Sequence, residues 1–149
     1  YAQDLAVKLA NGGKHYYLAT MIPCDEEDRE EIFRCRIPKL TLQPVVENSI
    51  LHGILEKESK SGTIVLTGWL EDKDVVLLIS DDGVGISPEK MPTILSGTGQ
   101  SSTGGTNIAI YNTHRRLQIL YGPKYGLTYT SKPGQGTEVQ IRIPAKKET

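Results

Sequence analysis

Residues 37–53 read IPKLTLQPVVENSILHG, and this stretch decides the fold that the sequence predicts. Its apolar residues recur at three- and four-residue steps as far as Ile54, which is typical of a helix with one face on a hydrophobic core. Pro44 would cost a backbone hydrogen bond inside such a helix, so we expect the regular helix to begin near Pro44 and to end near Glu56. Three polar residues interrupt the apolar pattern: Glu47, Asn48 and His52.

The rest of the chain supplies strands and further helices around this helix. Alternating and aromatic-rich patterns predict strands, and longer periodic runs predict helices. Strands are expected at 15–22, 32–36, 63–70, 75–80, 126–131 and 137–143, and helices at 88–95 and 107–121. Helices grouped with a largely antiparallel sheet indicate an α/β (α+β) two-layer sandwich, with a mixed sheet covered on one face by helices. In the helix over 107–121, the pattern places four residues on or near one side: Ile108, Tyr111, Leu117 and Leu120.

Length and composition indicate one ordinary globular domain. The chain has 149 residues, 38% of them hydrophobic, with 17 basic and 18 acidic side chains and a net charge of −1. This balance gives no electrostatic reason to expect nucleic acid as a partner. No apolar stretch approaches the roughly 18–20 residues that a membrane span requires. We expect residues 1–12 to be the end of a preceding helix or linker, and residues 13–149 to form the domain.

The first candidate site lies in the helix over 42–54. Asn48 and His52 are four positions apart and therefore share a helix face. Asparagine is unusual in a buried helix because it competes with the backbone for hydrogen bonds. Taken alone, Asn48 is better explained as a hydrogen-bonded core residue. The functional alternative is an oxygen donor to a hydrated magnesium ion.

The second candidate site is the segment LLISDDGVGIS over 77–87. An apolar strand ends at Asp81, and a carboxylate at a strand end can accept a hydrogen bond from an adenine amino group. Gly83 and Gly85 permit the close approach of a flat base and turns with positive φ. The alternative, a simple acidic-glycine turn, is common, but the preceding strand and the next motif make it the minority interpretation.

The third candidate is the loop over 96–106, SGTGQSSTGGT, which opens directly into a helix at Asn107. Backbone N–H groups and the positive end of the helix dipole would favour phosphates there. A flexible surface loop explains the composition almost as well. We expect the loop to be mobile without nucleotide and more ordered with Mg-ATP.

Together, in this order, the three motifs resemble the asparagine box and glycine boxes of the Bergerat-fold ATPases. Within that superfamily the chain is most similar to the LytS/YesM-type sensor histidine kinases. Three stretches carry this closer resemblance: IPKLTLQPVVENSILHG, DDGVGI and GQGTEVQIRIP. The segment YNTHRRLQILYG over 111–122 also resembles the family, so the resemblance covers about residues 13–144.

The resemblance implies ATP and Mg²⁺ as cofactors and a role for each matching residue. Asn48 would be the magnesium ligand, and with Glu47, which would position water or metal, it would form the catalytic pair. Asp81 would read adenine, and His52 would lie near the phosphates. The other implied nucleotide contacts are Gly83, Gly85 and Ile86 around the base, Gly104, Gly105 and Thr106 at the phosphates, and Thr137 on the adenine side.

Two departures from the family pattern bear on affinity. The second glycine box usually continues with further glycines, whereas Gly105 is followed here by Thr106, Asn107, Ile108 and Ala109. Leu51 stands where many relatives have a lysine that reaches phosphate. Both changes leave open whether nucleotide binding is weakened.

The resemblance implies the catalytic ATP-binding domain of a two-component sensor histidine kinase. It would supply the γ-phosphoryl group to a histidine on a dimerisation domain outside this chain, with a response regulator downstream. The full-length protein would be a bacterial inner-membrane receptor with this domain in the cytoplasm. Neither His15, His52 nor His114 lies in an acceptor-like sequence, so the fragment should not phosphorylate itself. The alternatives are an anti-sigma-type serine kinase, which the missing initiator methionine argues against, and a degenerate, non-catalytic nucleotide-binding or scaffold module.

Overall fold

The computed structural model describes residues 16–21, 35, 37–38, 41–59, 61–96 and 106–145. For residues 16–21 and 106–107 it describes the backbone only. The expected helix end within 1–12, most of the expected strand over 32–36 and the loop residues 97–105 lie outside this description.

A five-stranded sheet forms one layer of the molecule, in the order β1-β2-β3-β5-β4. The strands are β1 (Tyr16–Met21), β2 (Gly62–Glu71), β3 (Asp74–Asp81), β4 (Gly126–Lys132) and β5 (Gly136–Pro144). Strand β1 runs parallel to β2, and every other neighbouring pair is antiparallel. A parallel pair needs a long crossover connection, and the helical segment over 42–54 lies within it. The mixed, largely antiparallel sheet is therefore confirmed.

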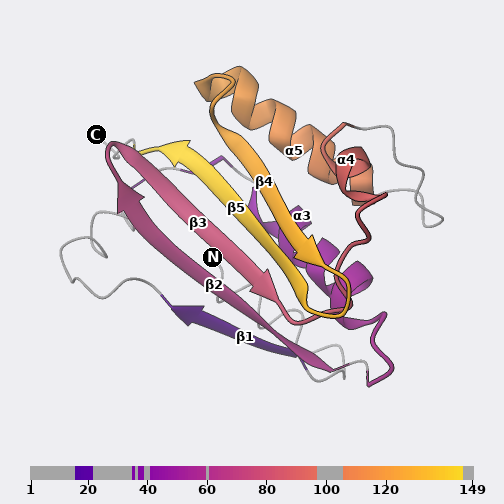
Figure 1. Ribbon diagram of the computed structural model, residues 1–149. Coiled ribbons are helices and arrows are strands. Elements are labelled where there is room, and N and C mark those ends of the chain that lie inside the picture. The colour runs from indigo at the N-terminus through magenta and orange to yellow at the C-terminus, as the bar shows by residue number, and fades with distance from the viewer. Residues whose placement is uncertain are drawn as a thin grey trace.

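Helices form the second layer on one face of the sheet (Figure 1). They are α3 (Leu42–Asn48), continued by the π-helix η1 (Ser49–Ile54), then α4 (Met91–Ile94) and α5 (Thr106–Tyr121). No helix among the described residues is both long and apolar enough to cross a membrane. The arrangement confirms the expected two-layer sandwich.

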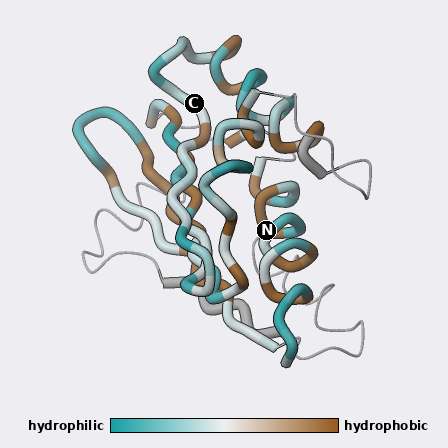
Figure 2. The backbone as a smooth tube through the Cα atoms, turned by 45° about the vertical axis from the view of Figure 1, so that its right-hand side comes forward, coloured by the Kyte–Doolittle hydropathy of each residue, from teal (hydrophilic) through white to brown (hydrophobic). Residues whose placement is uncertain are grey.

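The hydrophobic core lies between the two layers. Alternation along β2 and β5 sends every second side chain toward the helices, as a half-buried sheet requires. The turn between β2 and β3 is hydrophilic and leads into a hydrophobic stretch of β3 (Figure 2). The fully buried core side chains include Val45, Ile54, Ile79, Ile110, Leu117, Val139, Ile141 and Ile143.

The first helix differs from its prediction in two respects. It begins at Leu42 and not near Pro44, so Pro44 is its third residue. The first N–H groups of a helix have no partner within the helix, and a proline there forfeits no hydrogen bond. Its second half is a π-helix in which the Leu55 N–H donates to the Ile50 carbonyl at 2.9 Å. Apolar spacing does not distinguish this local widening from an α-helix.

Helix α5 has the expected bounds within one residue, and Leu117 is buried, but Ile108 and Leu120 do not share its buried face. Ile110, Thr113 and Leu117 are buried, whereas Ile108 is 55% exposed and Leu120 is 54% exposed. Ile108 precedes Leu117 by nine positions, which is two and a half turns, so the two point in opposite directions. Leu120 lies in the last turn of the helix, where little covers it.

Candidate functional site

Asp81 is the buried carboxylate at the end of β3. Its exposed fraction is 6%, and its side chain shares the helix-covered face of the sheet with Ile79. The Gly83 N–H donates to Asp81 Oδ1 at 2.9 Å. The Ser49 hydroxyl and the Thr137 backbone N–H also donate to the carboxylate. One helical residue, one residue after β3 and one residue of β5 therefore converge on one acidic group.

The electrostatic state of Asp81 reflects its burial. Desolvation raises its pKa above the ordinary carboxyl value, and the donors Gly83, Ser49 and Thr137 offset this only in part. The nearby charge of Asp82 adds to the increase in pKa. A buried carboxylate of this kind gains most from a ligand that donates a hydrogen bond, because the ligand replaces lost solvation.

The strand register extends the site along one row across the sheet. Asp81 pairs with Thr137 on β5, and Thr137 pairs with Ser131 on β4. Thr137 is 7% exposed, and its Oγ1 lies 2.9 Å from Ser131 Oγ in a hydrogen bond. Thr137, which the resemblance assigns to the adenine side, thus lies beside Asp81, and its contact with the nucleotide stays a prediction. Ser131 is a member of this row that the sequence analysis missed.

Ser131 also holds in place the segment after β3, residues 82–86, which we call the glycine segment. The Ile86 N–H donates to Ser131 Oγ at 2.8 Å, and the Ser131 hydroxyl contacts the Gly136 carbonyl at 2.8 Å. Gly85 has a φ of +77°, and a Cβ there would lie 2.2 Å from the Lys132 carbonyl oxygen. Only glycine meets both requirements. The predicted glycine turn is thus bound tightly to the loop between β4 and β5.

The π-helix brings a second glycine against the same segment. A Cβ on Gly83 would lie 2.4 Å from the backbone of Gly53, and a Cβ on Gly53 would lie 3.0 Å from Asp81 Oδ1. The Gly53 carbonyl accepts a hydrogen bond from the Val84 N–H at 3.1 Å. In a regular α-helix that carbonyl would bond to Lys57, which here donates to Ile54 instead. Because the helical segment ends at Ile54, the Gly53 carbonyl lies in its last turn and is available to anchor the segment after β3.

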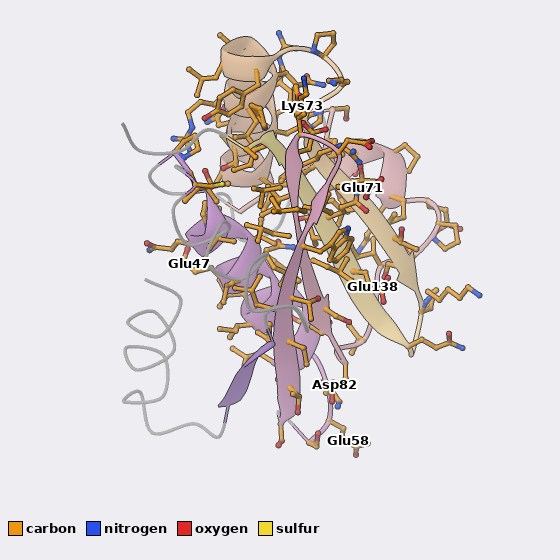
Figure 3. All side chains as sticks on the ribbon, turned by 90° about the vertical axis from the view of Figure 1, so that its left-hand side faces the viewer. Glu47, Glu58, Glu71, Lys73, Asp82 and Glu138 are labelled. Atoms are coloured by element: carbon orange, nitrogen blue, oxygen red, sulfur yellow. The ribbon has the colours of Figure 1, made fainter. Side chains whose placement is uncertain are left out.

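The neighbouring Asp82 has a different, structural role. Its Oδ1 accepts from the Thr63 N–H at 2.8 Å, and its own N–H donates to the Thr63 carbonyl at 3.3 Å. Lys57 Nζ lies 3.9 Å from its Oδ2 in an exposed ion pair. Figure 3 shows Asp82 and Glu58 at one end of the sheet, with Glu71 and Lys73 at the other. Of the two consecutive aspartates, only Asp81 enters the interior.

The polar helix residues lie on the segment that contacts Asp81. Glu47 and Asn48 end α3, and His52 lies in η1; all three are half-buried. Gln43 Nε2 donates to Glu47 Oε1 at 2.8 Å, and Glu47 points away from the sheet (Figure 3). Leu51, which the resemblance places where many relatives would have a lysine, is 48% exposed.

The residues predicted to contact the phosphates are Gly104, Gly105 and Thr106. Gly104 and Gly105 lie outside the described residues, and Thr106 begins α5 with its side chain not described. Within the described part of the chain, no group of three or more His, Cys, Asp or Glu side chains could hold a metal ion.

The Asp81 carboxylate is the buried acceptor that the family resemblance assigns to adenine. It lies beside Gly53 and Gly83, whose backbones pack against each other and against the carboxylate. The sequence model of the family described as histidine kinase-, DNA gyrase B- and HSP90-like ATPase matches residues 35–147. The chain belongs to this ATPase family.

Relatives of this ATPase domain are bacterial sensor kinases. It is 33% identical to the sensor histidine kinase YesM of Bacillus subtilis over 119 residues, covering 80% of this chain and 19% of YesM. It is 34% identical to the sensor protein LytS of the same organism, covering 74% of this chain and 18% of LytS. The sensor protein kinase HptS of Staphylococcus aureus is 31% identical, with 85% and 24% covered. The chain thus spans about a fifth of the length of these relatives.

Solved structures confirm the fold of the ATPase domain. The catalytic domain of the histidine kinase ThkA superposes with a TM-score of 0.63 at 18% identity, covering 99% of this chain and 92% of that domain. The histidine kinase domain of the Erythrobacter litoralis EL346 blue-light activated kinase gives 0.60 at 19% identity, covering 97% and 57%. Full-length ShkA in complex with AMPPNP gives 0.64 at 17% identity, covering 99% and 29%.

Proposed function

We propose that this ATPase domain is the catalytic ATP-binding domain of a two-component sensor histidine kinase. It would supply the γ-phosphoryl group of ATP to a histidine on a separate dimerisation domain. The observation that carries the proposal is the buried Asp81 carboxylate, held by donors from helix, glycine segment and β5. The similarity to YesM and LytS supports a histidine as the acceptor.

Asp81 would read the base. Its carboxylate accepts hydrogen bonds only, so it complements the amino group of adenine and opposes the carbonyl that guanine has at the same position. Thr137 lies opposite Asp81, and Gly83, Gly85 and Ile86 follow it in the segment that would face the base. These contacts would fix the adenine end and leave the phosphates directed toward α3 and α5.

Asn48 would ligate Mg²⁺ through its side-chain oxygen, and Glu47 would orient water or the ion. His52, four residues on from Asn48, would approach the phosphates. The N-terminus of α5 at Thr106, with Gly104 and Gly105 before it, would offer N–H groups to the same phosphates. Bound Mg²⁺ supplies charge neutralisation at the transferring phosphoryl group, while this chain positions it.

The partners follow from the same proposal. The acceptor histidine lies on a dimerisation domain beyond this chain, and a response regulator receives the phosphoryl group from it. The full-length protein would be an inner-membrane receptor with this domain in the cytoplasm. His52 lies in η1, the helical segment that contacts Asp81, and His114 lies on the side of α5 that faces the sheet. We therefore expect neither histidine to be the phosphoryl acceptor.

The test combines the purified domain with the histidine-bearing dimerisation helix of its own full-length protein and γ-labelled Mg-ATP. The proposal predicts label on the added helix that is lost in acid and retained in base, as expected for phosphohistidine. Label that is stable in acid and lost in base would indicate a serine kinase. If the domain binds ATP and labels nothing, it is a nucleotide-binding module without this activity.

A further inference from the structure

Tyr129 is a further polar residue on the helix-covered face of the sheet. It lies on β4 between Leu127 and Ser131, and alternation along the strand turns all three toward the helices. Tyr129 pairs with Val139 on β5, one row away from the row that holds Ser131, Thr137 and Asp81. Its side chain packs against the hydrophobic core.

The hydroxyl of Tyr129 is shielded from solvent and, within the described residues, has no hydrogen-bond partner. Buried tyrosine hydroxyls usually have a partner, because an unpaired buried hydroxyl costs stability. Tyr125 shows the usual arrangement in this molecule: its hydroxyl donates to Asp74 Oδ1 at 2.8 Å. The protein alone therefore leaves a donor unused at Tyr129.

The environment of Tyr129 keeps its proton in place. Burial raises the pKa of the phenol, and the negative charge of Asp81 raises it further. The hydroxyl is thus protonated at neutral pH and is close enough to Asp81 to be affected by its charge. The inner face of the sheet holds a buried acceptor, Asp81, and, within the described residues, a buried donor without a partner, Tyr129, on adjoining rows of the strand register.

We propose that the Tyr129 hydroxyl donates a hydrogen bond to a ring nitrogen of the adenine whose amino group binds Asp81. This proposal rests on the proposed function, since it concerns the same bound ATP. Adenine carries an amino donor next to ring nitrogens that accept only, so an acceptor and a donor on the protein complement it. Tyr129 would therefore add a specificity-determining contact that the glycine and asparagine motifs do not contain.

The experiment compares wild type, Tyr129→Phe and the matched control Tyr125→Phe by calorimetric ATP titration and by thermal unfolding without nucleotide. Tyr129→Phe should weaken ATP binding about three- to tenfold, the range for a neutral hydrogen bond. It should leave the melting temperature unchanged or raise it, because it removes an unpaired buried hydroxyl. Tyr125→Phe should do the reverse, lowering the melting temperature and leaving ATP affinity unchanged.

A second arm identifies the acceptor atom with ATP analogues in which one ring nitrogen of adenine is replaced by carbon. One analogue should bind wild type more weakly than ATP, and Tyr129→Phe should abolish that difference while retaining the others. Equal ATP affinity in wild type and Tyr129→Phe would overturn the proposal, as would an equal loss for ATP and every analogue. If wild type binds no ATP, the proposed function fails; if it binds ATP and only the Tyr129 effect is missing, this proposal alone fails.

Discussion

Gly53 and Gly83 are packed backbone to backbone, so that a Cβ on Gly83 would lie 2.4 Å from both Cα and the carbonyl carbon of Gly53. The same Cβ would lie 2.8 Å from Asp81 Oδ1. The contact joins the π-helix to the segment after β3, and both backbones lie against the Asp81 carboxylate. Both backbones are fixed by further hydrogen bonds, so neither can move aside without loss.

We predict that Gly83→Ala destabilises the domain by about 1–3 kcal/mol, the usual cost of overpacking. It should weaken ATP binding as well, because the added methyl group would displace the Asp81 carboxylate. Urea unfolding and ATP titration of the same variant measure the two effects. Unchanged stability and affinity together would show that the close packing of Gly53 and Gly83 is not required.

Asn48→Ala tests the metal side of the site. We expect the substitution to weaken binding of Mg-ATP much more than binding of metal-free ADP, because the proposed partner of Asn48 is the ion. Titrations with and without Mg²⁺ distinguish this from a general loss of packing. Equal losses for the two ligands would assign Asn48 a packing role.

Much of this fold follows from the order of apolar patterns along the chain. The strand alternation in β2 and β5 and the hairpin between β2 and β3 depend on local side-chain periodicity, so the sequence predicted them within two residues. The π-helix did not follow, because residues 49–54 have the same apolar spacing that an α-helix would show. Ile108 was misplaced because a three- or four-residue step, repeated from different starting points, fits more than one helix face.

Candidate site residues could be predicted where they form a contiguous motif. They could not be predicted where their position depends on the register between two strands. Asp81, Gly83 and Gly85 are adjacent in sequence, and Thr137 came from the family resemblance. Ser131 and Tyr129 reach the site only because β4 pairs with β5 in one particular register. Their one sequence signal, alternation along 126–132, does not say which residues lie beside Asp81.

Asp74 anchors the end of β3 opposite Asp81. Burial alone would raise its pKa, but hydrogen bonds from Arg142 (2.9 Å) and Tyr125 (2.8 Å) hold the pKa below its ordinary value. We predict that Asp74→Asn costs about 1.5–3 kcal/mol at neutral pH, the range for hydrogen bonds to a charged group. The depressed pKa means that this stability is present above the ordinary carboxyl pKa of 3.8 and is lost as pH falls from there through the lower pKa of the folded state, so the difference between the variant and wild type should shrink in acid.

Urea unfolding of wild type and Asp74→Asn between neutral and acidic pH measures this difference. Glu71→Gln is the matched control, since the Glu71 side chain is 51% exposed and lies 3.6 Å from Arg142. Its effect should stay below about 1 kcal/mol. A difference between Asp74→Asn and wild type that does not shrink in acid would contradict the ionic account.

His114 links α5 to β4 in its neutral form. Its Nδ1 accepts a hydrogen bond from the Leu127 N–H at 2.9 Å, and burial, followed by the charge of Arg115, lowers its pKa. Because the pKa of His114 is lowered in the fold, the unfolded chain binds a proton at a higher pH than the folded chain does. The contribution of neutral His114 to stability is therefore lost as pH falls below the ordinary value of 6.5. We predict that wild type loses more stability than His114→Gln between about pH 7.5 and pH 5.5. Parallel pH profiles in urea unfolding would contradict this role.

The most direct test of the nucleotide site compares two buried carboxylates at opposite ends of one strand. Asp81→Asn should weaken ATP binding about ten- to a hundredfold, because hydrogen bonds to charged groups contribute about 1.5–3 kcal/mol. It should leave the unfolding free energy equal or higher, since burial raises the pKa of Asp81 and disfavours its charge in the fold. Asp74→Asn should lower stability and leave ATP affinity unchanged. Calorimetric ATP titration of the two folded variants and wild type decides the matter: a loss confined to Asp81→Asn is predicted, and wild-type affinity in Asp81→Asn would contradict the assignment of this site.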